Sequence, residues 1–303
     1  MRTRVFLLII ATMCAGTSPG TALVGGALSL DGEASYVEID PSPGLYTNQE
    51  LTVTGWFRAD VSLSSRSWQA IFWKGDVPDQ SPYANREYGL WLSASGHLQL
   101  CSTPADTLVR AAAMLDAPQA QIQPGQWYHF AAVISTTQDS MQLYLNGRAL
   151  ASRAFHNSGI RPTAGPLRLG GIPDRDYFRG LLDEVRVWHR RLSPGEITRD
   201  LHSAVELAAP GLVAAYTFDD TDAPGSAADA SGNGHTGQLR GQARLVRLRV
   251  LVPPLSAMPD SLSTDDMAPD YATSLAQRPI GGELADVLIL ALRSDDHRVR
   301  RRA

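Results

Sequence analysis

The chain of 303 residues has only two cysteines, so a network of disulfide bonds does not hold its fold together. Its two marked apolar stretches, one at residues 5–13 and one after residue 283, are too short to span a bilayer. The formal net charge is only −4, which gives no general attraction to nucleic acid or to anionic membranes. Any binding or catalytic role must therefore be inferred from local features.

Several enzyme signatures are also missing. No H-E-x-x-H or C-x-x-C metal spacing accompanies the seven histidines, and no P-loop occurs. These absences argue against the zinc peptidases and the P-loop nucleotide-hydrolysing enzymes.

The N-terminus has the pattern of a secretory signal. Arg2 and Arg4 precede the apolar stretch at 5–13, and Gly20-Thr21-Ala22 is a small-x-small site suited to signal peptidase. We predict a signal peptide at residues 1–22. The protein is then expected to be secreted or on the cell surface, with the periplasm as an alternative, and to have no membrane span in the mature chain.

The two cysteines have different expected roles. Cys14 raises the alternative of lipid attachment, although the bulky Met13 fits poorly where a small residue is expected. After cleavage Cys101 would be the only cysteine left, and its neighbours Leu100 and Ser102 supply no base. We expect Cys101 to be a small apolar side chain in a strand.

Between residues 28 and 192 the sequence has many short strand signals separated by Gly and Pro, and little helical periodicity. Residues 141–145 and 148–154 flank Asn146-Gly147, which predicts a tight hairpin. Residues 127–134 are apolar on both faces, which predicts a central strand. This part of the chain therefore predicts an all-β antiparallel sandwich.

One short helix is expected after the last of these strands. Ser193-Pro194-Gly195-Glu196 combines a capping serine, a proline at the first helical position and a glutamate three residues after the cap. The helix should end near residue 208, and residues 211–218 read as a further strand. Residues 246–282 are rich in Pro, Ser and Asp and are predicted to be a disordered linker, and residues 283–303 are predicted to be a helical tail.

The order of the strand segments resembles a known family. The segments are "ALSLDGEASYVEID", "LTVTGWFRAD", "IFWKGD", "YGLWLSASGHLQL", "GQWYHFAAVI", "MQLYLNGRAL", "LRLGG" and "FRGLLDEVRVWHRRLSPGEI". Together they resemble the laminin-G-like jelly-roll domains of the concanavalin A-like lectin/glucanase superfamily. The resemblance implies a jelly roll at 23–208 with a flanking segment at 209–245, and residues 283–303 resemble part of a HEAT repeat.

The stretch at 178–197 invites an enzymatic interpretation because Asp183 and Glu184 are adjacent acids. In a strand, neighbouring side chains point to opposite faces, so these two cannot act as a paired acid and base. Alternation would place Asp183 in line with Val185 and Val187, and Glu184 beside Arg186, where a salt bridge is expected. Glycosidases of the family carry an E-x-D-x-x-E pattern on one strand, which this sequence lacks, so we expect no enzymatic activity.

Two kinds of ligand site remain as hypotheses. The resemblance implies that Asp31 and Asp183 could bind a Ca²⁺ ion, since oxygen ligands suit calcium. The alternative is that Asp31 belongs to a turn with Gly32 and Asp183 caps backbone amides. Trp68 and Tyr83 are the aromatic candidates for stacking on a sugar, although most tryptophans in a sandwich belong to its core.

A secreted or surface-exposed, non-catalytic binding module for carbohydrate or for an extracellular protein is the favoured function. A glycan-active enzyme of the same superfamily and a structural spacer joined to helical repeats are the alternatives, because the fold alone does not decide function. The turn at His189-Arg190-Arg191 is expected to be solvated.

Overall fold

The computed structural model describes residues 20–47, 49–60, 68–76, 86–105, 112–156, 159–202, 207–221 and 225–252. By internal contacts the chain divides into a main unit, residues 26–201 and 205–246, and a second unit, residues 1–25, 202–204 and 247–303. Residues 1–19 of the predicted signal, the predicted linker beyond 252 and the predicted tail at 283–303 lie outside the described residues.

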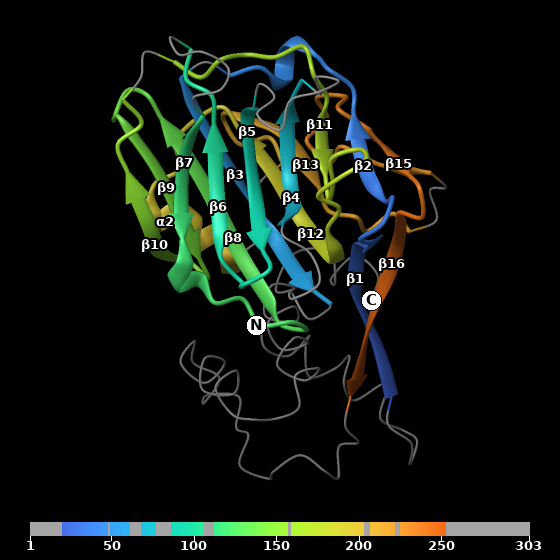
Figure 1. The fold of residues 1–303 in the computed structure, drawn as a ribbon. Helices are drawn as coiled ribbons and strands as arrows, with labels where there is room; N and C mark the ends of the chain where they lie inside the picture. The colour runs from blue at the N-terminus through green and yellow to red at the C-terminus, as the bar shows by residue number, and fades with distance from the viewer. Residues whose placement is uncertain are drawn as a thin grey trace, which may run out of the picture. The chain divides into compact units, whose positions relative to one another are not determined.

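The predicted antiparallel β-sandwich is confirmed. Sheet A has the strand order β10-β9-β8-β3-β12-β1-β16 in the described residues, with β13 also paired to β12 (Figure 1). Its strands are β1 (Gly20–Asp31), β3 (Glu50–Ala59), β8 (Trp127–Ser135), β9 (Ser140–Leu145), β10 (Arg148–Arg153), β12 (Arg179–Trp188), β13 (Leu212–Tyr216) and β16 (Arg244–Val252).

Sheet B faces sheet A across the core and has the order β14-β15-β2-β11-β4-β5-β6-β7 in the described residues. Its strands are β2 (Tyr36–Ile39), β4 (Trp68–Gly75), β5 (Arg86–Ser93), β6 (Leu98–Ser102), β7 (Ala113–Ala117), β11 (Leu167–Leu169), β14 (Ser226–Ala227) and β15 (Gly237–Arg240). The described helical segments are η1 (Pro43–Leu45), η3 (Pro118–Ala120) and α2 (Pro194–His202). No helix in these described ranges is both long and apolar enough to cross a membrane.

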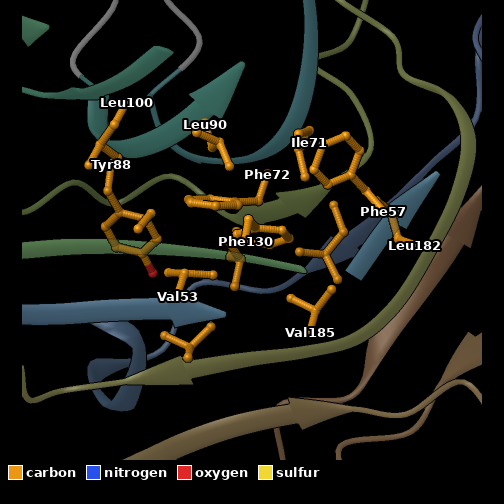
Figure 2. Close-up of a cluster of buried hydrophobic side chains, with 14 of the residues drawn as sticks. Val53, Phe57, Ile71, Phe72, Tyr88, Leu90, Leu100, Phe130, Leu182 and Val185 are labelled. Carbon is orange, nitrogen blue, oxygen red and sulfur yellow. The ribbon is translucent and has the colours of Figure 1, made fainter. Parts of the chain in front are cut away.

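The core lies between the inward faces of the two sheets. Figure 2 shows aromatic and aliphatic side chains from both sheets meeting there, and the rings of Phe72 and Phe130 are stacked with centroids 5.7 Å apart. The rings of Phe57 and Phe130 are 6.2 Å apart, which extends the contact along sheet A. Burial of this apolar surface is the main term that stabilises the fold, since Cys101 is the only cysteine in the described residues.

Local sequence signals account for the turns. Asn146 and Gly147 have φ angles of 50° and 75°, the positive values that a tight primed hairpin between β9 and β10 requires. At the start of α2, Glu196 accepts a hydrogen bond from the Ser193 backbone amide at 2.8 Å, and Ser193 Oγ accepts one from the Glu196 amide at 3.3 Å. This reciprocal pair is the predicted capping box.

The segment predicted to flank the jelly roll is part of the sandwich. Strand β13 pairs with β12 in sheet A, and β15 pairs with β2 in sheet B. Strand β16 then begins at Arg244 and continues to Val252, into the predicted linker. The predicted boundary at residue 209 lies between α2 and β13.

Candidate ligand-binding face

The outer face of sheet B, which points away from the core, holds a row of polar and aromatic side chains. On β11, Leu167 and Leu169 are in the core, so Arg168 between them points outward. In register, Arg168 lies opposite Glu38 of β2 and Trp73 of β4. Three strands that are distant in sequence therefore place a cation, an anion and an indole in one row.

Arg168 is held on three sides. Its Nε and Nη2 donate to one oxygen of Glu38, at 2.9 and 2.8 Å. Its guanidinium carbon lies 5.4 Å from the centroid of Trp73 and 5.9 Å from that of Tyr36. The side chain is only 9% exposed, yet its third nitrogen, Nη1, is buried without a hydrogen-bond partner.

Glu38 also forms a salt bridge with a second arginine. Its other carboxylate oxygen accepts a hydrogen bond from Nη2 of Arg240 on β15, at 3.2 Å. These three side chains together have two guanidinium charges and one carboxylate charge, an excess of one positive charge among them.

A second aromatic side chain, Trp91 of β5, lies beside Trp73 in the same layer. Its indole lies over Gly89, where a Cβ atom would come within 2.6 Å of the ring, so this position requires glycine. Arg86 lies over the same indole, with its guanidinium carbon 4.8 Å from the centroid. Both tryptophans are almost fully buried, so they form the floor of this face.

The segment at residues 171–177 packs over this floor. Ile172 joins the cluster that contains Trp73 and Trp91, and the Asp176 carbonyl accepts a hydrogen bond from the Ala70 amide at 2.7 Å. Burial raises the pKa of the Asp176 carboxyl, although nearby Arg175 and a hydrogen bond from Trp91 oppose this effect.

The partly exposed rim of the face is aromatic. The rings of Tyr177 and Tyr36 have centroids 6.2 Å apart, and both side chains are half-buried. Trp68 at the start of β4 packs against the same cluster and is also half-buried, whereas Tyr83 lies outside the described residues. The structure thus places Trp68 at this face, and a sugar contact by either residue stays a prediction.

The two predicted calcium ligands are not brought together. Leu28 of β1 pairs with Leu182 and Asp31 pairs with Arg179, so Asp31 and Asp183 are about 13 Å apart along the strand direction. Calcium–oxygen distances are far shorter, about 2.3–2.6 Å, so one ion cannot bind both carboxylates. The described residues also contain no cluster of three or more His, Cys, Asp or Glu side chains arranged to bind a metal.

Asp31 instead closes a turn, as the alternative predicted. One carboxylate oxygen accepts hydrogen bonds from the backbone amides of residues 33, 34 and 35 and from the Ser35 hydroxyl. Partial burial acts to raise the pKa of Asp31, but these hydrogen bonds outweigh it and lower the pKa to about 2. Calcium binding elsewhere in the chain stays a prediction.

The predicted orientation of Asp183 is wrong. Strand β12 has a bulge against β3 between Asp183 and Arg186, and Glu184 at its centre has a φ of 51°. The bulge interrupts the alternation, so Val185 and Val187 face the core while Asp183 lies opposite Trp56 on the outer face of sheet A. The two neighbouring acids do not form a catalytic pair.

The acids near the bulge help to attach helix α2. Arg186 forms the predicted salt bridge with Glu184 and also donates to Asp200 of α2 at 2.7 Å. The second Asp200 oxygen lies 3.1 Å from Nε2 of His129 on β8. Burial of Asp200 acts to raise its pKa, but Arg186, His129 and Thr54 together lower it.

The turn after β12 is less solvated than predicted. His189 is half-buried, its Nε2 has no hydrogen-bond partner, and burial lowers its pKa. Arg190 donates to Glu196 at 2.7 Å and to the carbonyl of Pro210 at 2.8 Å, so it joins the turn to α2 and to the segment before β13.

A shallow hollow lies elsewhere in the described residues, lined by Ser42, Gly44, Leu212, Val213, Asn233 and His235. Its polar side chains are already engaged. His235 Nδ1 lies 3.1 Å from Ser42 Oγ, and the Asn233 amide donates to the carbonyl of Val213 at 2.9 Å. Residues 232–237 have G-x-G-x-x-G spacing, but they lead into strand β15 and not into a helix, unlike a dinucleotide-binding turn. We therefore place the candidate site at Arg168.

Comparison with known proteins identifies the family of the chain. A family model described as the concanavalin A-like lectin/glucanases superfamily matches residues 31–198, more than half of the chain. Pentraxin-4 of Homo sapiens is 25% identical over 152 residues, which are 47% of this chain and 32% of that protein.

Solved structures share the fold. A Bacteroides ovatus protein described as a candidate carbohydrate-binding protein has a TM-score of 0.57 and 17% identity, and the match covers 77% of this chain and 62% of that one. The CBM40 module of a Ruminococcus gnavus sialidase, bound to α2,3-sialyllactose, has a TM-score of 0.43 and 14% identity, covering 58% and 98%. The chain spans less than two thirds of Pentraxin-4 and of the Bacteroides protein.

Proposed function

Because the chain belongs to the concanavalin A-like lectin/glucanases superfamily, we propose that it is a non-catalytic carbohydrate-binding module of a secreted or cell-surface protein. The N-terminal signal pattern supports the location. The Bacteroides protein of the same fold, described as a candidate carbohydrate binder, supports the ligand class.

The single observation that carries the proposal is Arg168 Nη1, a donor without a partner on an aromatic face. Small-ligand sites are mostly apolar and aromatic, with a few well-placed polar groups that fix the ligand's orientation. Tyr36, Tyr177 and Trp68 supply partly exposed rings on which the apolar face of a sugar can stack.

The acids support the non-catalytic part of the proposal. A glycosidase needs two carboxyl groups on either side of one glycosidic bond, one of them free to protonate the leaving group. Asp200 and Glu184 are both paired with Arg186, and the bulge directs Asp183 to the outer face of sheet A. The family's E-x-D-x-x-E pattern is absent from the sequence.

A glycan array probed with the full chain, in Ca²⁺ and in EDTA, tests this function. We expect binding to at least one glycan, weakened at least about tenfold by Tyr177→Ala and unchanged by Arg148→Ala on β10 of the other sheet. Loss of binding in EDTA alone would add calcium to the ligand set. No glycan bound above background in either buffer would refute the proposal, and release of reducing ends from a polysaccharide would favour the enzyme.

A further inference from the structure

One edge of the Arg168 guanidinium has a donor without an acceptor. A guanidinium carries five N–H donors in one plane, and Glu38 occupies the edge formed by Nε and one hydrogen of Nη2. The edge formed by Nη1 and the other hydrogen of Nη2 remains, and Nη1 has no acceptor. A buried donor without a partner destabilises the protein, and a ligand oxygen placed there would remove this cost.

The geometry of this edge matches a carboxylate. Two parallel N–H groups bind the two oxygens of a carboxylate in a planar, two-point contact. Tyr36 and Trp73 flank the guanidinium, so an acceptor approaches in its plane. A single hydroxyl would use only one of the two donors.

The local charge also favours an anion. Arg168 and Arg240 share the one carboxylate of Glu38, which leaves one positive charge uncompensated in this group. A neutral sugar leaves this excess in place, whereas a carboxylate neutralises it. A carboxylate adds a second charge to hydrogen bonds whose donor is already ionised, and it can accept from both N–H groups of the edge at once.

We propose that the glycan recognised at the outer face of sheet B is acidic, and that a sugar carboxylate binds the Nη1–Nη2 edge of Arg168. This inference rests on the proposed carbohydrate-binding function. Nη1 is covered in the free protein, so a neighbouring side chain must move when the carboxylate enters, and the half-exposed rings of Tyr36 and Tyr177 lie on the same face. The same rings then pack against the sugar.

The test compares acidic glycans with their carboxyl-reduced forms. Oligosaccharides of polygalacturonate, alginate and hyaluronate, together with sialyllactose, are titrated into the full chain by calorimetry, each beside the derivative in which the carboxylate is an alcohol. We expect at least one acidic glycan to bind, with affinity at least about tenfold above its reduced form and falling as salt is added.

Three variants locate the contact. The Arg168→Gln variant should bind the acidic glycan at least about tenfold more weakly. The Arg168→Lys variant keeps the charge but not the planar pair of N–H donors, so its affinity should lie between those of Arg168→Gln and the unmodified protein. Arg148→Gln on β10 removes the same charge from the other sheet and should bind like the unmodified protein. If Arg168→Gln does not fold, as shown by circular dichroism, Arg168→Lys alone decides.

The outcomes separate the two proposals. Equal binding of the acidic and reduced forms, or full affinity in a folded Arg168 variant, overturns the carboxylate contact and leaves carbohydrate binding intact. Binding of neutral glycans alone would also overturn the carboxylate contact and leave the carbohydrate-binding function intact. Failure to bind any glycan, acidic or neutral, overturns the proposed function together with this inference.

Discussion

Lys74 and Glu87 form a fully buried ion pair, and replacing one partner should destabilise the fold strongly. Lys74 Nζ lies 2.6 Å from Glu87 Oε2, and both side chains have no exposed surface. Lys74 also donates to the carbonyl of Thr163 at 3.1 Å, and Glu87 accepts from the backbone amide of Thr163 at 2.9 Å and of Thr47 at 3.3 Å. Burial lowers the pKa of Lys74 and raises that of Glu87, and their mutual attraction opposes both shifts.

In Lys74→Met the Glu87 carboxylate keeps only neutral donors, and in Glu87→Gln the Lys74 ammonium loses its counter-ion. Each change leaves one uncompensated buried charge, which costs about 3–5 kcal/mol. The double variant Lys74→Met/Glu87→Gln removes both charges, and its amide oxygen can still accept from the backbone amide of residue 163, although its NH2 group cannot accept from that of residue 47. It should therefore be more stable than either single variant.

Urea unfolding followed by tryptophan fluorescence measures the effect. With a urea dependence of about 2 kcal/mol per molar, a loss of about 4 kcal/mol lowers the midpoint by about 2 M. Arg58→Ala is the matched control because the Arg58–Asp60 pair is exposed, with side chains 30% and 38% accessible, and should cost less than about 1 kcal/mol. A shift in Lys74→Met as small as in this control, or a double variant less stable than both singles, would refute the reasoning.

Three further predictions concern single groups. Tyr88→Phe should not destabilise the fold and should gain up to about 1–2 kcal/mol in urea unfolding, because the buried Tyr88 hydroxyl has no partner; a clear loss would reveal one. Burial raises the pKa of Cys101 to about 11, so a thiol reagent in mildly alkaline buffer should modify it only after unfolding, and rapid reaction of the folded protein would contradict its burial. The pKa of His189 is lowered from 6.5 first by burial and then by His235 and Lys74, so the unfolded chain binds more protons. Stability should therefore fall as pH drops below 6.5, and His189→Gln should flatten this part of the pH–stability curve; an unchanged slope would exclude His189 as its origin.

Features that depend on a few neighbouring residues could be predicted from the sequence. The hairpin at Asn146-Gly147 follows from two residues that tolerate positive φ, and the cap of α2 from Ser193 and Glu196. The central position of β8 follows from its two apolar faces, and all of its residues are buried. These signals lie within one turn or one strand.

Features that depend on partners far along the chain could not be predicted from the sequence. The bulge at Glu184 is set by the register of β12 on β3, whose residues come more than 120 positions earlier, and so the orientation of Asp183 was predicted wrongly. Arg168 was not singled out, although an arginine between two leucines of a short strand is a signal of an outward-facing cation. Its importance depends on Glu38, 130 positions away, and on Trp73.

Hydrogen exchange of the full chain, with and without a glycan that it binds, tests the central claim most directly. The site proposed here predicts slower exchange, on ligand addition, in β2, β11 and residues 171–177. It predicts no change in helix α2 or in residues 229–235 beside the shallow hollow. Protection confined to α2 or to the hollow, with the outer face of sheet B unaffected, would contradict the assignment of this face as the carbohydrate-binding site.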